Sequence, residues 1–226
     1  MGVRLRVVAY NIHSSRDDPT ALAAVVRGLE PDVLIVQEGP RRLRWRSKGA
    51  ALAHSFGMVV AAGGMPALGN VIMTTLRVRV REAWETRFPL KPGRHMRGVA
   101  FARCEVGGVS FTAVGAHLST DDEERPSQAE GLRQALGALD GPVILGADLN
   151  DVPGSRSWEL VHQELADVGE RSGCGEVFTF PCRAANRRID TIAVSSHVEV
   201  ESYQVETGPL TVRASDHFPL VAELVL

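Results

Sequence analysis

The sequence has no apolar run long enough to cross a membrane. Its longest apolar stretches reach only the length of a strand, whereas a membrane span needs about 18 apolar residues. The N-terminus, MGVRLRVVAYNIHSS, alternates polar and apolar residues and lacks the basic head, apolar stretch and cleavage site of a signal peptide. We therefore expect a cytoplasmic protein that does not insert stably into a membrane.

Cysteine is scarce, and a strong net charge is absent. None of the three cysteines lies at zinc-finger spacing from another cysteine or a histidine, which suits a reducing compartment. Cys174 and Cys182 flank one loop, and such a compartment favours free thiols over a bridge between them. A net charge of −2 and a pI near 6.4 argue against coating nucleic acid through bulk charge, but they allow a local basic groove.

The 226 residues, of which 44% are hydrophobic, suffice for one domain over residues 1–226 with a sizeable core, and we expect a monomer. Periodicity predicts strands at 3–10, 33–36, 99–106, 109–116, 142–145, 189–194, 198–205 and 218–225, with short ones between 57 and 82. It predicts helices from Asp18-Pro19, at 43–56, and from Asp121-Asp122 to Leu139. This mixture implies an α/β sandwich of packed sheets flanked by helices.

Polar side chains that bind metals or protons stand at the ends of six predicted strands. They are Asn11, Glu38, His117, Asp148 with Asn150, Asp190, and Asp216 with His217. In open α/β sheets, the edge where loops from several strands converge is where ligands bind. Taken singly, each residue is more simply explained as a turn former or a structural histidine.

Together these residues make a donor set that suits a hard divalent cation. Carboxylate and amide oxygens favour Mg²⁺ or Mn²⁺, and the histidines add general acid-base groups. The lack of clustered cysteines and of a compact histidine triad argues against structural zinc. Such a set supplies what phosphate-ester hydrolysis requires, namely an activated water and neutralisation of the charge that develops on the phosphate oxygens.

Six short motifs carry a resemblance that spans almost the whole chain. They are YNI at 10–12, QE at 37–38, GAHL at 115–118, GADLN at 146–150, RID at 188–190 and SDH at 215–217. Their order and spacing resemble those of the endonuclease/exonuclease/phosphatase superfamily, which includes DNase I-like nucleases and neutral sphingomyelinases. The resemblance implies a four-layer α/β sandwich, with two packed mixed β-sheets flanked by helices, and a metal-dependent hydrolase of phosphoric esters.

The resemblance also implies a metal site and a water site. Glu38 would be the principal ligand of Mg²⁺ or Mn²⁺, with Asn11 and Asp216 completing or supporting the site. Asp148 would orient or deprotonate the water that attacks phosphorus directly, and Asn150 would hold that water or a phosphate oxygen.

The remaining motif residues are implied to contact the phosphate. His217, bonded to Asp190, would stabilise the transition state as a cation or proton donor, because the carboxylate raises the imidazole pKa and fixes its tautomer. His117 would contact the phosphate from the opposite side. Arg97 and Thr179 match family positions near the substrate, although Arg97 also fits a surface arginine on a strand.

The substrate is less constrained than the chemistry. The stretch PRRLRWRSK at 40–48 follows Glu38 and combines five cations with Trp45, a composition that suits a nucleic-acid backbone and a stacked base. The alternative is a helix with a solvated basic face and Trp45 in the core. A second basic cluster, at 183–188, flanks Asp190.

We therefore predict a nuclease that acts on DNA or RNA. The main alternative is a phosphodiesterase or phosphatase for a lipid or small-molecule phosphate ester, since a fold does not choose its substrate. A catalytically silent nucleic-acid-binding module is a further alternative, which the intact motif residues disfavour.

Overall fold

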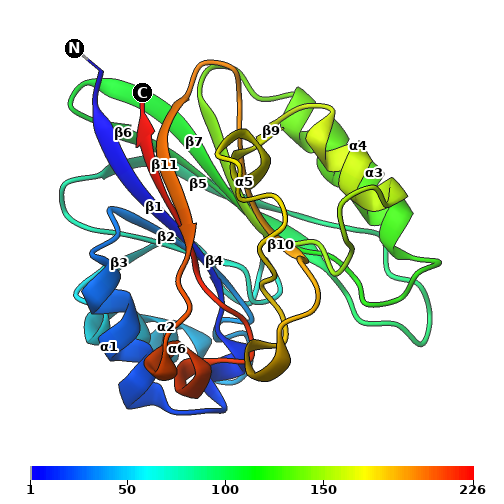
Figure 1. Cartoon of the computed structure of the whole chain (residues 1–226), viewed down its shortest axis with the longest axis horizontal. Helices are drawn as coiled ribbons and strands as arrows, with labels where there is room; N and C mark the ends of the chain where they lie inside the picture. Colours follow the sequence, from blue (N-terminus) through cyan, green and yellow to red (C-terminus); the bar gives the residue numbers. More distant parts are fainter. Residues whose placement is uncertain (1) are drawn as a thin grey trace.

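Two six-stranded mixed β-sheets pack face to face in the structure, a computed structural model that describes residues 2–226 (Figure 1). Sheet A has the order β11 (Glu199–Val205), β12 (Leu220–Val225), β1 (Arg4–Asn11), β2 (Val33–Gln37), β4 (Val71–Thr74) and β3 (Val59–Gly63). Sheet B has the order β5 (Arg79–Arg87), β6 (Gly98–Val106), β7 (Val109–His117), β8 (Val143–Asp148), β10 (Asp190–Val194) and β9 (Ala166–Asp167). Each sheet contains one parallel pair, β1 with β2 and β7 with β8.

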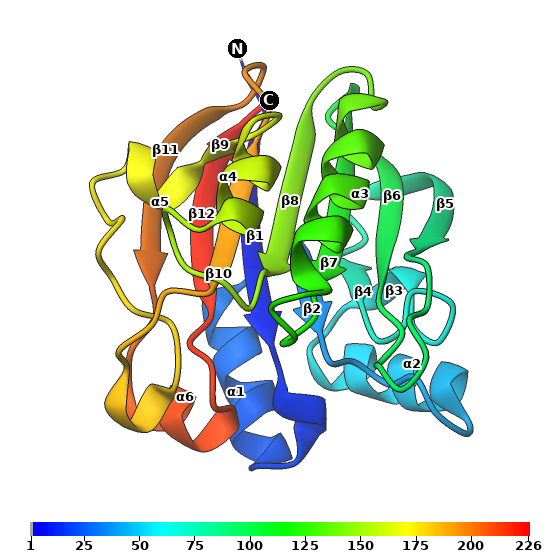
Figure 2. The same cartoon turned by 90° about the vertical axis from the view of Figure 1, so that its right-hand side faces the viewer.

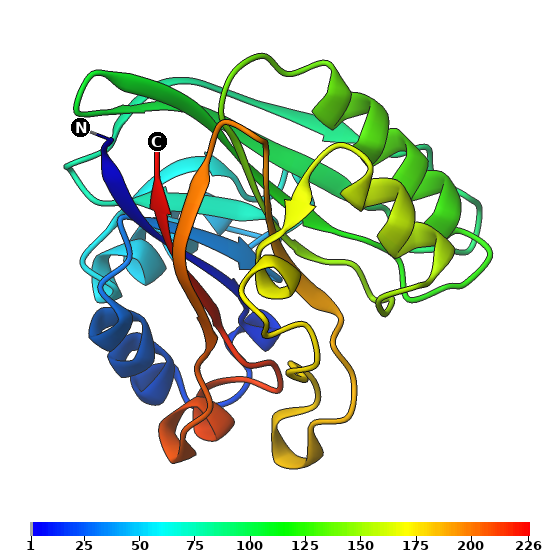
Figure 3. The same ribbon diagram turned by 45° about the horizontal axis from the view of Figure 1, so that its top comes forward.

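Helices cover the outer faces of both sheets and complete a four-layer sandwich (Figure 3). Sheet A is covered by α1 (Pro19–Leu29), α2 (Trp45–Ser55) and α6 (Pro209–Ala214). Sheet B is covered by α3 (Arg125–Gly137) and α4 (Arg156–His162), which run side by side. The remaining short helices are η1 (His13–Ser15), α5 (Val168–Arg171) and η2 (Cys182–Ala184). The predicted fold class is therefore confirmed.

The strand period decides which core each side chain enters. In β1, Leu5, Val7 and Ala9 enter the core between the sheets, whereas Val8 and Tyr10 pack under the helices of sheet A. A strand segment covered on both faces is apolar almost throughout, as residues 7–10 of β1 are. Burial on both faces thus fixes the register of β1, because a one-residue slip would exchange the two faces.

Gly146 lets the two sheets approach closely beneath the polar strand ends. A Cβ atom at this position would lie 2.9 Å from the Cβ of Ile35 and 3.0 Å from that of Ala9. Gln37 spans the same junction, because its Nε2 donates a hydrogen bond to the carbonyl of Gly146 at 3.0 Å. The close contact brings the end of β8 in sheet B next to the ends of β1 and β2 in sheet A.

Most predicted elements are present, and their local signals act as expected. Asp18 caps α1 by accepting hydrogen bonds from two backbone N–H groups at 3.0 Å. Gly107 and Gly108, with φ of 57° and 83°, form the turn of the β6–β7 hairpin, as tight hairpins require. The third predicted helix begins at Arg125, because the carboxylate of Asp121 first closes a turn. The sequence analysis missed α4, α5 and α6, which are short.

The topology brings all six polar strand ends to one end of the molecule. The parallel pairs place the carboxyl ends of β1 beside β2 and of β7 beside β8. The strands β10 and β12 run antiparallel to β8 and β1, so their first residues lie at this same end. The resulting polar edge lies at the lower end of the strands in Figure 2.

Candidate active site

Asp148 is central to the polar edge. It ends β8, is 1% exposed, and accepts hydrogen bonds from Nδ2 of Asn11 at 2.8 Å and from the backbone N–H of Asn150 at 2.9 Å. Nε2 of His117 lies 3.3 Å from Asp148 Oδ2. Asn150 turns back toward the carboxylate because its φ is 51°, a left-handed conformation that asparagine tolerates well.

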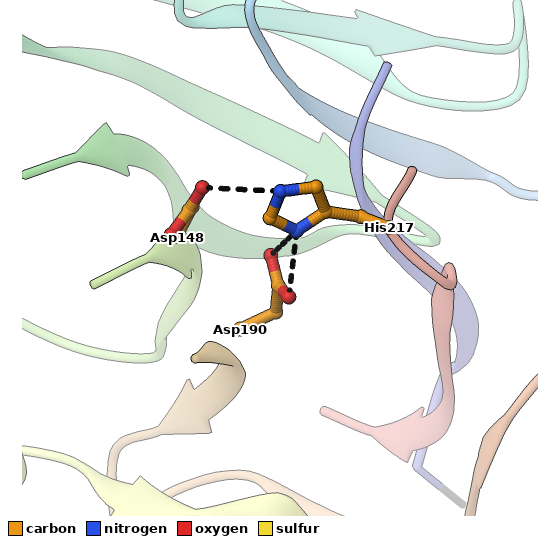
Figure 4. A group of neighbouring side chains, drawn as sticks. All are labelled: Asp148, Asp190 and His217. Carbon is orange, nitrogen blue, oxygen red and sulfur yellow. Dashed lines mark hydrogen bonds and ion pairs between the residues drawn. The ribbon is translucent and has the colours of Figure 1, made fainter. Parts of the chain in front are cut away.

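His217 faces Asp148 from the loop before β12 and is held by Asp190 (Figure 4). Its Nδ1 lies 3.0 and 3.1 Å from the two carboxylate oxygens of Asp190, and its Nε2 lies 3.8 Å from Asp148 Oδ2. Burial alone would lower the pKa of His217, but Asp190, Asp148 and Asp216 together outweigh it and raise the pKa to about 10. His217 is therefore a cation at neutral pH, with Nε2 facing Asp148.

His117 is the opposite case. Burial is the main reason that its pKa falls to about 3, and Asp148, which favours the charged form, does not offset that effect. Its Nε2 lies 3.0 Å from Nδ2 of Asn150, whose amide also donates to the carbonyl of Leu118 at 3.0 Å. Asp148 thus lies between a neutral histidine and a charged one.

In the metal-free protein, the pKa values of the two histidines should be shifted in opposite directions from the ordinary value. We expect ¹⁵N NMR in EDTA to find His217 doubly protonated above pH 8 and His117 neutral at pH 5. By linkage, the stability from His217 is full below the ordinary pKa of about 6.5 and is lost as pH rises through about 10. Stability associated with His117 falls as pH drops below about 6.5. Titration of both rings near 6.5 would contradict this assignment.

Glu38 follows β2 and faces the η1 segment. Its φ of 57° turns the chain sharply after the strand, and its Oε2 accepts a hydrogen bond from the Ser14 hydroxyl at 2.8 Å. Three successive residues, His13, Ser14 and Ser15, have φ values between 45° and 55°. Non-glycine residues seldom adopt this conformation, and here it sets Ser14 against Glu38.

Asp216 offers an oxygen that lacks a protein partner. Its Oδ1 is buried and accepts no hydrogen bond from residues 2–226, and it lies 3.8 Å from His13 Nδ1 and 3.9 Å from His217 Nε2. An unpartnered carboxylate oxygen is costly unless a cation or a proton donor binds it. Together with the carboxylate of Glu38, it fits the donor chemistry of a hard divalent cation.

A second group of possible ligands lies deeper. Ligand atoms of Asp148, Asp190 and His217 all fall within 4.8 Å of one another. In this group Nδ1 of His217 is already bonded to Asp190. Asn11 is also engaged, because its Oδ1 accepts from the backbone N–H of His13 at 3.0 Å while its amide donates to Asp148.

Arg97 shares the charge environment of the polar edge. Its Nε is buried without a hydrogen-bond partner within residues 2–226, and burial lowers its pKa despite the opposing charges of Asp148, Glu38 and Glu124. An arginine with free donors beside these carboxylates is ready to bind an anionic oxygen.

Thr179 lies behind the site. It is 0% exposed, and its hydroxyl oxygen accepts from the backbone N–H groups of Ile189 and Asp190 at 3.2 and 3.4 Å. Thr179 therefore fixes the start of β10 and the position of Asp190, and it offers no surface to a substrate.

The basic segment at 40–48 enters a helix and exposes most of its cations, as the alternative predicts, but Trp45 fits neither prediction made for it. Trp45 begins α2 and is half-buried, with the guanidinium of Arg46 4.3 Å from its ring centroid. The ring also packs on Gly64, where a Cβ would lie 2.4 Å from it. Trp45 is therefore neither a core residue nor an open platform for a base.

Arg188 does not belong to a free basic cluster, which corrects the expectation for 183–188. It is 4% exposed, and its Nη2 lies 2.6 Å from both carboxylate oxygens of Asp167. Its guanidinium also lies 4.9 Å from the ring centroid of Trp158. The periodicity gave no sign of this buried ion pair, because the partners are far apart in the sequence.

Removing one partner of this ion pair should be costly. We expect Arg188→Gln to lower the free energy of unfolding by about 3–5 kcal/mol, since it leaves the Asp167 carboxylate buried and unpaired. The exposed neighbour provides a matched control, and Arg187→Gln should change stability by less than about 0.5 kcal/mol. Urea denaturation followed by circular dichroism measures both, and equal effects would refute the assignment.

Three residues near the polar edge are not among the predicted site residues. Ser14 and Arg41 lie outside the motifs, and Glu124 has a buried carboxylate whose Oε2 has no hydrogen-bond partner within residues 2–226. Arg41 donates a hydrogen bond to the carbonyl of Leu68 at 3.1 Å, and its charge lowers the pKa of His117 and Arg97. A run of arginines directly after Glu38 is the one sequence signal that pointed toward Arg41.

This chain resembles known proteins in both sequence and fold. The model of the endonuclease/exonuclease/phosphatase family matches residues 8–217. No protein of curated function matches the sequence significantly. The chain belongs to the endonuclease/exonuclease/phosphatase family and is a hydrolase of phosphoric esters.

Solved structures share the fold over nearly the full length of both chains. A family protein from Bacteroides thetaiotaomicron has 19% identity and a TM-score of 0.82, covering 100% of this chain and 96% of that one. A mannosyl-6-phosphatase from the same organism has 18% identity and a TM-score of 0.79, covering 98% and 100%. TDP2 from D. rerio, complexed with a single-strand DNA product, has 18% identity and a TM-score of 0.76, covering 98% of each chain.

Two further expectations can be compared with the structure. No helix within residues 2–226 is long and apolar enough to span a membrane. Cys104, Cys174 and Cys182 are all free thiols.

Proposed function

We propose that this protein is a nuclease that hydrolyses phosphodiester bonds of DNA or RNA with the help of Mg²⁺ or Mn²⁺. The observation that carries the proposal is the position of the Asp148 carboxylate between neutral His117 and charged His217. We further propose that residues 1–226 act as one catalytic domain, as a monomer, in the cytoplasm. Three free thiols support a reducing compartment.

In this mechanism Asp148 acts as the general base. Asn11 and Asn150 hold its carboxylate by hydrogen bonds, so one oxygen is oriented to take a proton from an attacking water. Asn150 and His117 form the neutral polar wall on one side. No covalent intermediate is required, because the base activates water directly.

Three cationic or polar groups bind the phosphate. His217 presents a protonated Nε2 and is kept charged by Asp190, so it stabilises negative charge that develops on the phosphate oxygens. Arg97 adds its unpartnered donor. A divalent ion held by Glu38 and Asp216, with Asn11 beside it, would supply further neutralisation of charge.

Nucleic acid is the substrate that two observations favour. The basic segment includes four side chains that form no ion pair within residues 2–226, namely Arg42, Arg44, Arg46 and Lys48. These cations are available to bind phosphate groups. One structural neighbour is TDP2 with a single-strand DNA product. The second candidate is a small phosphate ester, favoured by the neighbour that is a mannosyl-6-phosphatase.

A substrate panel tests this proposal. Purified protein would be incubated with Mg²⁺ or Mn²⁺ and with single-stranded DNA, duplex DNA, RNA, bis-p-nitrophenyl phosphate or mannose 6-phosphate. Asp148→Asn serves as the blank for contaminating nucleases. Cleavage of a polymer by the wild type and not by the variant supports the proposal that the protein is a nuclease. Hydrolysis of only the small esters rejects that proposal in favour of the second candidate function. No hydrolysis of any substrate would favour a silent binding module.

A further inference from the structure

A pocket of about 510 Å³ opens directly beside Glu38. Its walls come from three segments: η1 with the residue that follows it, the turn after β2, and the middle of α2. Ser14 lines the pocket and donates its hydroxyl hydrogen bond to Glu38. The pocket is therefore continuous with the proposed metal site and is not used by the mechanism above.

Cations dominate the lining of this pocket. Arg16, Arg41, Arg42 and Lys48 line it, and Glu38 is its one carboxylate. None of the four cations forms an ion pair within residues 2–226. Unpaired cations around a concavity create a positive potential that concentrates anions.

Some arginines elsewhere on the surface are neutralised by carboxylates. Arg81 pairs with Glu105 at 2.7 Å, and Arg103 pairs with Glu82 at 2.8 Å. Other exposed arginines, such as Arg79 and Arg156, also form no ion pair within residues 2–226, so the pocket is distinguished by the convergence of four unpaired cations on one concavity. This excess of positive charge favours a ligand that carries negative charge.

Arg41 lines the pocket and also acts electrostatically on residues of the polar edge. Its guanidinium donates a hydrogen bond to the carbonyl of Leu68, and its positive charge lowers the pKa of both His117 and Arg97. Because Glu38 also lines the pocket, an anion bound there would lie beside the proposed metal site. Two phosphate groups of one molecule fit this arrangement.

We propose that this pocket binds a second phosphate group of the substrate, next to the phosphate that is hydrolysed. In a nucleic-acid strand this group is the neighbouring phosphodiester, and the guanidinium fork suits its paired oxygens. The inference rests on the proposed function, because the phosphate that is hydrolysed must bind beside Asp148. A small molecule with two phosphates presents the same chemistry.

Binding without metal or turnover tests the pocket first. Calorimetry in EDTA and low salt would compare thymidine 3′,5′-bisphosphate with thymidine 5′-monophosphate. We expect the wild type to bind the bisphosphate about tenfold or more tightly, and Arg42→Gln/Lys48→Gln to lose most of that advantage, since charge-assisted contacts are lost. Arg79→Gln/Arg156→Gln removes the same charge from exposed, unpaired positions outside the pocket and should keep it.

The outcomes separate the pocket from the catalytic proposal. Equal affinity for the two probes, including no measurable binding of either, overturns the inference, and so does an equal loss in the control variant. A tenfold preference without hydrolysis of any ester in Mg²⁺ would keep the pocket and reject the proposed function.

Two further probes identify the source of the second phosphate. Affinity that rises further with the length of oligothymidylate supports a nucleic-acid strand. Fructose 1,6-bisphosphate bound as tightly as the nucleoside bisphosphate supports a small bisphosphate in the same pocket. In either case, Arg42→Gln/Lys48→Gln must weaken the binding.

Discussion

Replacing Asp148 by asparagine is expected to lower kcat by about 10²- to 10⁴-fold, the range for losing a positioned general base. The substitution keeps the shape of the side chain, and its oxygen can still accept one of the hydrogen bonds from Asn11 and Asn150. It removes the charge that takes the proton from water. The fold should therefore survive while turnover is lost.

Single-turnover rates on a labelled strand measure this effect, with circular dichroism to verify the fold. Asp140→Asn is the matched control, because Asp140 is exposed and lies outside the polar edge. Normal turnover by Asp148→Asn would reject Asp148 as the base. A similar loss in Asp140→Asn would show that net charge, and not position, is responsible.

The second large effect is expected for His217. Changing it to glutamine should lower kcat by about 10²- to 10³-fold, because it removes a cation aimed at developing charge. The substitution also leaves Asp190 buried without its partner, so stability should fall. A second variant is needed to separate these two consequences.

Asp190→Asn supplies that second variant, because it leaves the imidazole in place. We expect a smaller loss, of about 10- to 100-fold, since Asp190 acts through His217. The exposed His197 gives the control, and His197→Gln should behave as wild type. Rates for Asp190→Asn equal to wild type would contradict a charged His217 as part of the mechanism.

Much of the polar edge was predictable because strand geometry is simple. An apolar run that ends in a polar residue identifies a strand end, and parallel or antiparallel order then decides which ends meet. Asp148 and Asp190 were found in this way and lie opposite each other in the register of β8 and β10. The family motifs supplied their expected roles, which periodicity alone does not give.

The parts that were missed depend on long-range packing or unusual backbone conformation. The left-handed turn at 13–15 sets Ser14 against Glu38, and no hydrophobic pattern encodes it. Arg188 looked like a surface cation until the structure placed it against Asp167. Thr179 matched a family position, but only the fold reveals that its hydroxyl braces backbone behind Asp190.

Carboxylate contacts, and not burial, explain why the pKa values of His117 and His217 differ. Both His117 and His217 are 5% exposed, so desolvation acts on each. Of the two, only His217 has a carboxylate, that of Asp190, hydrogen-bonded to its ring, whereas the charges of Arg97, His217 and Arg41 all lower the pKa of His117. The sequence suggested the Asp190 contact but gave no means of predicting a neutral His117.

The most direct test of a metal-dependent phosphoesterase is the rate of DNA-strand hydrolysis against Mg²⁺ concentration, for the wild type and Glu38→Gln. Our account predicts saturable activation of the wild type, none in EDTA, and a Mg²⁺ requirement raised by about tenfold or more in the variant, since a charged ligand is lost. Hydrolysis that persists in EDTA, or identical Mg²⁺ curves for the two proteins, would contradict it.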